Sequence, residues 1–133
     1  ILMLQPTSPF RTVKQLLRVL KQLINNELDC VWTVSATDQK YHPIKQMYIK
    51  DGLLNYVMEE GKSLPTRQTL KPTYHVNGLA YAFTRDCILK QRKRMGLKTA
   101  PLIIKEKVVN IDTMDDFYYA EKHLEAFLNK ETF

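Results

Sequence analysis

The sequence contains few of the residues that build thiolate, disulfide or histidine sites. Its two cysteines, Cys30 and Cys87, form no C-x-x-C pair and are too few for a disulfide framework or a zinc site. We therefore expect both to be buried thiols. The three histidines, His42, His75 and His123, have no spacing typical of metal ligands or of a catalytic base beside a nucleophile.

The chain also lacks an apolar run long enough to cross a membrane or to act as a signal peptide. Apolar residues make up 44% and charged residues 26% of the sequence, as in ordinary globular domains. We expect a cytoplasmic protein with no membrane partner. The net charge of +6 suits an anionic partner such as a nucleotide or an acidic sugar.

Glycine is scarce, and the four glycines, at 52, 61, 78 and 96, form no phosphate-binding loop. The sequence opens on the apolar run 1–4, a pattern typical of a strand buried on both faces of a parallel sheet. A buried strand is not expected at a free terminus. We therefore expect 1–133 to be the C-terminal part of one larger α/β domain, entered at a central strand.

The first third predicts a strand, a helix and a second strand. A proline-rich turn at 5–11 leads into a helix that starts at about Thr12, and 30–36 is the next strand. The apolar face of the helix is expected to contain Val13, Leu16, Leu17, Leu20, Leu23 and Ile24. This order predicts a parallel crossover unit, whose ligands would gather at the carboxyl ends of the strands, beside the 5–11 turn and after Ala36.

The middle third predicts an excursion from the main sheet at 38–75. Two short strands at 46–50 and 53–58 flank Asp51-Gly52, a strong hairpin signal. After a polar loop, a strand at 79–83, a short helix capped by Thr84 and a strand at 102–104 are expected. In the last helix the inward residues would be Phe117, Ala120, Leu124, Phe127 and Leu128.

Polar oxygen ligands occur where 108–111 is expected to be a strand that leads into the last helix. Asn110 and Asp112 alternate with apolar residues, so on a strand they would project from the same face. Such a pair can hold Mg²⁺, which prefers oxygen ligands. Alternatively, Thr113 and Asp116 form a capping-box-like pair, and Asp112 only favours the positive end of the helix. The segment alone leaves both interpretations open.

Five short segments occur in a recognisable order along the chain. The first four are LQPTSPFR at 4–11, HPIK at 42–45, TRQ at 66–68 and NGLAY at 77–81. The fifth lies within 111–121 and consists of IDT at 111–113, DF at 116–117 and AE at 120–121. Together they resemble the acylneuraminate cytidylyltransferases, which are the CMP-sialic acid synthetases and their relatives for other nonulosonic acids. The resemblance implies a partial nucleotidyltransferase, Rossmann-like mixed sheet with flanking helices and an antiparallel dimerisation excursion.

The resemblance also implies the reaction. The anomeric hydroxyl of a nine-carbon sugar acid would attack the α-phosphate of CTP, pyrophosphate would leave, and Mg²⁺ would offset the charge at the phosphate. The enzyme would be a homodimer. The glycine- and lysine-rich nucleotide-binding segment of the family has no counterpart in 1–133, so we expect this chain alone to have little or no synthetase activity.

The site residues follow from the same resemblance. Gln5 would lie at the sugar-acid pocket, with Thr7 and Ser8 shaping it, and Asn77 and Tyr81 would line it. Each has a structural alternative as well. The Gln5 amide can bind backbone within its turn, Asn77 begins a probable Asn-Gly turn, and Tyr81 has the apolar neighbours of a core residue.

The charged residues complete the implied site. Lys45 and Arg67 match basic catalytic residues at its acidic end that can reach the neighbouring subunit, although on exposed loops they would by default be solvated. Asp112 would bind the metal together with Asn110. The best-known members have a second Asp at the position of Asn110, and an amide brings no charge, so metal affinity should be lower or Asp112 should act largely alone. Arg11 is expected to be structural.

Two other interpretations belong to different functional classes. A basic run could bind nucleic acid, but no nucleic-acid-binding motif accompanies it and such runs are commonly solvated. Its members are Lys90, Arg92, Lys93, Arg94 and Lys98. A catalytically silent remnant or dimerisation module is the other alternative.

Overall fold

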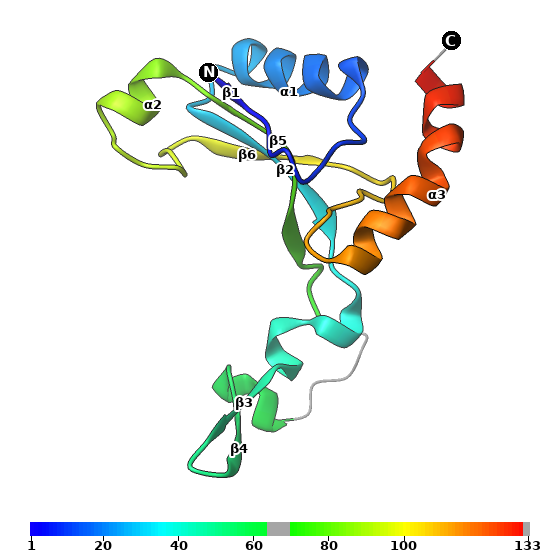
Figure 1. Ribbon diagram of the computed structural model, residues 1–133. Helices are drawn as coiled ribbons and strands as arrows, with labels where there is room; N and C mark the ends of the chain where they lie inside the picture. Colours follow the sequence, from blue (N-terminus) through cyan, green and yellow to red (C-terminus); the bar gives the residue numbers. More distant parts are fainter. Residues whose placement is uncertain (64–69, 132–133) are drawn as a thin grey trace. The chain divides into compact units, whose positions relative to one another are not determined.

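The computed structural model describes residues 1–63 and 70–131, which form a mixed α/β structure (Figure 1). The chain divides into two compact units. One contains Ile1–Ser35 and Val76–Phe133, and the other contains Ala36–His75. In the described residues no helix has the length and apolarity needed to span a membrane.

The first unit is built on a four-stranded mixed sheet with the order β1-β5-β2-β6. The strands are β1 (Leu2–Met3), β2 (Cys30–Ala36), β5 (Tyr74–Phe83) and β6 (Thr99–Ile103). β1 pairs antiparallel with β5, and β2 pairs parallel with β6. The expected combination of a mixed sheet and flanking helices is confirmed.

The parallel pairing predicted for the first strand is wrong. β1 has only two residues, lies at an edge of the sheet and pairs antiparallel. Its neighbours remain accessible, with Ile1 62% and Leu4 38% exposed. β5 lies between β1 and β2, so the strand-helix-strand order does not make β1 and β2 neighbours. An apolar run does not specify whether the strand that it forms pairs parallel or antiparallel.

Helix α1 (Val13–Asn25) begins where its cap predicts. The Thr12 hydroxyl accepts from the Gln15 amide at 3.1 Å, and the Gln15 side chain accepts from the Thr12 amide at 2.9 Å. The expected inward face is partly confirmed, because Leu23 is buried and Leu16 and Leu20 pack against the core, together with Val19. Three of the residues expected to face inward are instead exposed, namely Val13, Leu17 and Ile24.

Two further helices flank the sheet. Thr84 caps α2 (Arg85–Leu89) by accepting from the Cys87 amide, as predicted. In α3 (Met114–Glu131), Ala120 is buried and Phe127 stacks on Phe10 with ring centroids 4.8 Å apart. The inward face predicted for α3 is only partly correct, because three of its members are 43–55% exposed. They are Leu124, Phe117 and Leu128.

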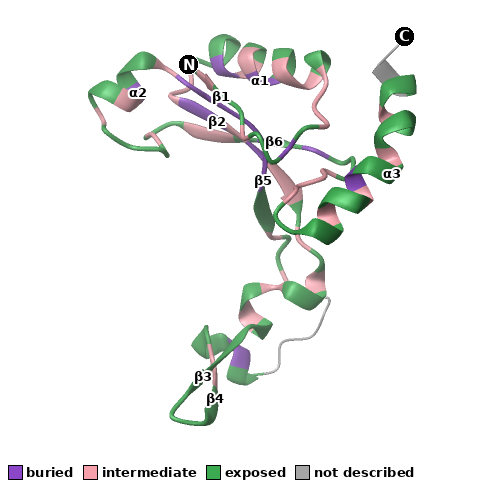
Figure 2. Ribbon diagram, in the orientation of Figure 1, coloured by how far each residue is buried: buried purple, intermediate pink, exposed green. Residues whose placement is uncertain are grey.

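The core lies along β2 and β5, where buried residues concentrate (Figure 2). Val31 and Leu79 pack with α1, whereas Cys30 and Cys87 belong to a second cluster with Tyr81. Both thiols are buried, as expected, and burial raises the pKa of Cys30 to about 11. The Cys30 thiol is therefore a poor nucleophile.

The second unit contains the predicted hairpin. β3 (Met47–Lys50) and β4 (Leu53–Tyr56) pair antiparallel around Asp51-Gly52, and both turn residues have positive φ, at 53° and 76°. Short 3-10 helices occur at Gln39–Tyr41, Pro43–Lys45 and Glu59–Ser63. Every residue of β3 is exposed (Figure 2), so within this unit the hairpin has little apolar burial to stabilise it.

A buried hydroxyl joins β2 to β5 and gives a test of the core. Thr33 Oγ1 donates to the Ala80 carbonyl at 2.8 Å and accepts from the Ala80 amide at 3.0 Å. Thr33→Val removes both bonds from a dry site, and we expect the free energy of unfolding to fall by about 2–4 kcal/mol in urea titrations. Thr73→Val is the control, because Thr73 Oγ1 is buried without a partner among the described residues. If Thr33→Val lowered the free energy of unfolding no more than Thr73→Val, the Thr33 hydroxyl would not stabilise the pairing of β2 with β5.

Candidate functional site

Three segments that are distant in the sequence meet at Gly78 in β5. A Cβ built on Gly78 would lie 2.8 Å from Ser8 Oγ and 3.3 Å from Asn110 Oδ1, and closer still to Gln5 Oε1. Gly78 also has a φ of +72°, which a side chain would strain. The missing side chain therefore lets the 5–11 turn and the loop before α3 pack against the strand.

The turn and the loop are also tied directly to each other. Ser8 is buried, and its hydroxyl donates to Asn110 Oδ1. The Ile111 amide donates to the Thr7 carbonyl at 2.8 Å. One side-chain bond and one backbone bond thus hold the loop beside the turn.

The turn has its own internal support. The Ser8 amide donates to the Gln5 carbonyl at 3.1 Å, and Arg11 Nε donates to the Ser8 carbonyl at 2.9 Å. The Arg11 Nη2 group donates to the Gln5 and Ser8 carbonyls. Desolvation by burial lowers the pKa of Arg11. The structural role expected for Arg11 is confirmed.

Two residues of the implied sugar pocket lie inside the fold. Asn77 is 2% exposed, and its side chain donates to Ser35 Oγ at 3.0 Å and accepts from the Leu79 amide at 3.2 Å. Asn77 and Gly78 lie within β5 rather than in the predicted turn. Tyr81 is 3% exposed and packs edge-on against Trp32 at 5.2 Å. The structural alternative is therefore favoured for Tyr81, whereas Asn77 has a structural role in β5 that differs from the predicted turn.

The segment before α3 is a loop, so the strand predicted at 108–111 is wrong. The Ile111 amide bonds to the Thr7 carbonyl of the turn, and no strand is assigned to these residues. Alternating polarity predicts a strand only where a partner strand is available, and here the neighbour is a turn. The argument that Asn110 and Asp112 project from one strand face therefore no longer applies.

The capping interpretation of the same segment is confirmed. The Asp116 amide donates to Thr113 Oγ1 at 3.2 Å, and the Thr113 amide donates to Asp116 Oδ2 at 2.9 Å. The Thr113 hydroxyl also donates to this carboxylate at 2.7 Å. These bonds, with one from the Asp112 amide, lower the pKa of Asp116.

The oxygen atoms available for a cation are fewer than the sequence suggests. Asn110 Oδ1 already accepts from Ser8, whereas Asp112 is exposed. Among the described residues no group of three or more His, Cys, Asp or Glu side chains could hold a metal. Mg²⁺ is often held by one or two carboxylates together with substrate phosphates, and Asp112 can supply one carboxylate of that kind.

Lys45, one of the two basic residues of the implied site, belongs to the second unit. Lys45 is exposed at the end of a 3-10 helix in the second unit, where His42 Nδ1 accepts from the Ile44 amide at 3.3 Å. Arg67, together with the rest of the 66–68 motif, lies outside the described residues. The residues that gather around Gly78 are thus Gln5, Ser8 and Asn110, with Thr7 tied to the adjoining loop.

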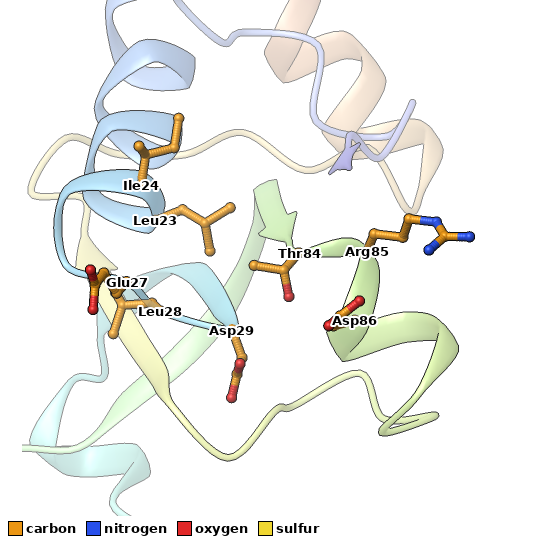
Figure 3. A pocket seen from close by; sticks show the side chains of 8 residues that line it. All are labelled: Leu23, Ile24, Glu27, Leu28, Asp29, Thr84, Arg85 and Asp86. Atoms are coloured by element: carbon orange, nitrogen blue, oxygen red, sulfur yellow. The ribbon is translucent and has the colours of Figure 1, made fainter.

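A separate cavity of 490 Å³ lies between the end of α1 and the start of α2 (Figure 3). Three carboxylates belong to its lining, those of Glu27, Asp29 and Asp86, and the protein's own groups bind two of them. Asp29 accepts from the Lys98 amide at 2.8 Å, and this bond is the main cause of its lowered pKa. Asp86 pairs with Lys90 at 2.6 Å, and the Arg85 side chain points away from the cavity (Figure 3). Asp29 and Asp86 therefore already have partners within the protein.

The basic run forms the exposed loop after α2. Its backbone is anchored from inside, because the Trp32 indole donates to the Arg94 carbonyl at 3.0 Å and the Cys87 thiol donates to the Lys93 carbonyl at 3.5 Å. The basic side chains are therefore displayed to solvent. No base-reading motif accompanies them.

No protein-family model matches the chain, and no curated protein matches it. The resemblance to the cytidylyltransferases therefore depends on the five short segments. Gly78 is the residue whose importance the sequence did not reveal, since its Asn-Gly pair signals a turn. Its role depends on contacts with two distant segments.

The packing at Gly78 can be tested with a matched pair of glycine variants. Gly52→Ala, at φ +76° with no atom within 4 Å of the added methyl group, is expected to cost about 1 kcal/mol. Gly78→Ala must also displace the side chains of Gln5 and Ser8. We therefore expect it to lower the free energy of unfolding, measured by urea titration, by about 3 kcal/mol. NMR amide shifts should change at 5–11 and at Asn110. Equal decreases in the free energy of unfolding for the two variants would contradict the crowding of Gly78 by its neighbours.

Proposed function

We propose that the chain is part of a cytidylyltransferase that transfers CMP from CTP to a nonulosonic sugar acid and releases pyrophosphate. The observation that carries this proposal is the meeting of three motif segments around Gly78. The 5–11 turn, the Asn77-Gly78 pair and the loop at Asp112 are separate in the sequence and adjacent in the first unit. Functional motifs are expected to converge in this way on one site.

Within this proposal, Gln5 provides the amide that orients the sugar acid. Ser8 and Asn110 fix the turn that carries Gln5, with Thr7 joined to the loop by its carbonyl. Asn77 supports the strand beneath the site through Ser35, and Tyr81 supports it through Trp32. The first unit thus positions the acceptor for attack, which is the main contribution a protein makes to phosphoryl transfer.

Asp112 is the residue proposed to hold Mg²⁺. Its carboxylate is exposed, and Asp116 binds its amide, which keeps the backbone of Asp112 at the start of α3. A bound Mg²⁺ would neutralise charge on the phosphates of CTP. Lys45 and Arg67 are proposed to add positive charge at the acidic end of the substrate.

A homodimer is proposed because the second unit presents apolar residues to solvent. Ile49 and Leu54 face each other across the hairpin and are 74% and 71% exposed. A two-stranded hairpin is marginal in isolation, and burial against a second copy would stabilise it. The same exposure supports the alternative function of a catalytically silent dimerisation module.

The catalytic proposal is tested with the product of the whole gene, CTP, Mg²⁺ and N-acetylneuraminic acid, by following pyrophosphate release. We expect Mg²⁺-dependent turnover. Asp112→Asn should lower the rate at least about tenfold at limiting Mg²⁺, with partial recovery at high Mg²⁺, because a charged ligand is lost.

Asp115→Asn is the matched control, since Asp115 is another exposed carboxylate in the first turn of α3. It should leave the Mg²⁺ dependence unchanged. Absence of turnover with every nonulosonic acid tried, or equal effects of the two substitutions, would contradict the proposal.

The homodimer is tested by sedimentation velocity of the chain. Ile49→Lys places a charge in the hairpin surface and should weaken dimerisation at least about tenfold. Ile24→Lys, at a 70% exposed isoleucine of α1, is the control. A monomer at all accessible concentrations, or equal weakening by both variants, would exclude a dimer through the hairpin.

A further inference from the structure

A second cavity of the first unit has the features of a small-molecule site. It has a volume of 270 Å³ and lies where the start of α1, the loop before Asn110 and one face of α3 come together. The residues from α3 include Tyr119, His123 and Phe127, which recur on one side of the helix. This volume suits a ligand smaller than most drug-sized molecules.

The walls of the cavity are mainly aromatic. Phe10 stacks on Phe127 with centroids 4.8 Å apart, and Tyr119 stacks on His123 with centroids 4.0 Å apart. His123 Nδ1 lies 2.7 Å from the Tyr119 carbonyl and donates to it, which fixes the orientation of the imidazole. Two pre-ordered ring pairs thus offer flat surfaces and edges to a planar ring.

Two residues of opposite charge, consecutive in the sequence, belong to the lining. Lys107 Nζ is 4.1 Å from the centre of the Tyr119 ring and 2.9 Å from its hydroxyl, so the ammonium is held at the wall. An ammonium has three donors, and this bond uses one of them. The neighbouring residue in the chain, Glu106, also lines the cavity and is exposed. A ligand that complements both residues carries a carboxylate and an ammonium close together.

We propose that this cavity binds a free aromatic amino acid. The ring enters between the two aromatic pairs, the α-carboxylate meets Lys107, and the α-ammonium meets Glu106. The proposal does not depend on the cytidylyltransferase assignment, because none of these contacts involves Gln5, Ser8 or Asp112. It assigns the chain a second ligand of a different chemical class.

The test is NMR titration of the 133-residue chain with L-tryptophan, indole-3-propionate, tryptamine and L-cyclohexylalanine. We expect L-tryptophan to bind most tightly and to shift the amides of Lys107, Val109 and Ala126. Removing either charge or the aromatic ring from the ligand should weaken binding about threefold to fivefold, the usual scale for accessible ion pairs and ring contacts.

Variants assign the two charges separately. Lys107→Met should weaken the binding of L-tryptophan and of indole-3-propionate but leave the binding of tryptamine unchanged. Glu106→Gln should weaken the binding of L-tryptophan and of tryptamine but leave the binding of indole-3-propionate unchanged. Lys105→Met, an exposed lysine outside the lining, is the control and should change nothing. Equal affinity for all four compounds, shifts confined to other parts of the chain, or no binding at millimolar L-tryptophan would overturn the proposal.

Discussion

The close approach at Gly78 is the constraint on which the arrangement of the first unit depends. Polar atoms of Gln5, Ser8 and Asn110 occupy the space that a side chain at this position would need. Because Ser8 is buried, its hydroxyl requires a partner, and Asn110 supplies it. One backbone position on β5 therefore determines where the turn after β1 and the loop before α3 can lie.

Polar groups inside this unit are consistently paired. Thr33 binds both backbone groups of Ala80, and Asn77 uses both ends of its amide. Such pairing offsets the cost of removing these groups from water, and each bond requires a specific geometry. Buried polar contacts thus select the relative positions of β2 and β5 as well as stabilising them. The same selectivity would benefit a site in which Gln5 must hold a substrate in a defined orientation.

Local signals in the sequence predicted local structure well. Thr12, Thr84 and the Asp51-Gly52 pair each act within a few residues, and each begins a helix or forms a turn as expected. Pairing between distant strands was predicted poorly, because the antiparallel direction of β1 depends on β5, which lies between β1 and β2. The candidate site shows the same division. Its turn was visible in the sequence, whereas the crowding at Gly78 and the bond from Ser8 to Asn110 depend on tertiary contacts.

The anchoring of the loop after α2 has a consequence for how this chain can vary. Cys30, Cys87 and Trp32 all bind carbonyl oxygens of Lys93 and Arg94, and carbonyls are common to every amino acid. These bonds place no demand on the side chains of Lys93 and Arg94, whereas Gly96 in the same loop has no room for a Cβ beside Asp29 and Cys87. The side chains at 93 and 94 can therefore change from basic to neutral or acidic while the bonds that anchor their backbone are kept.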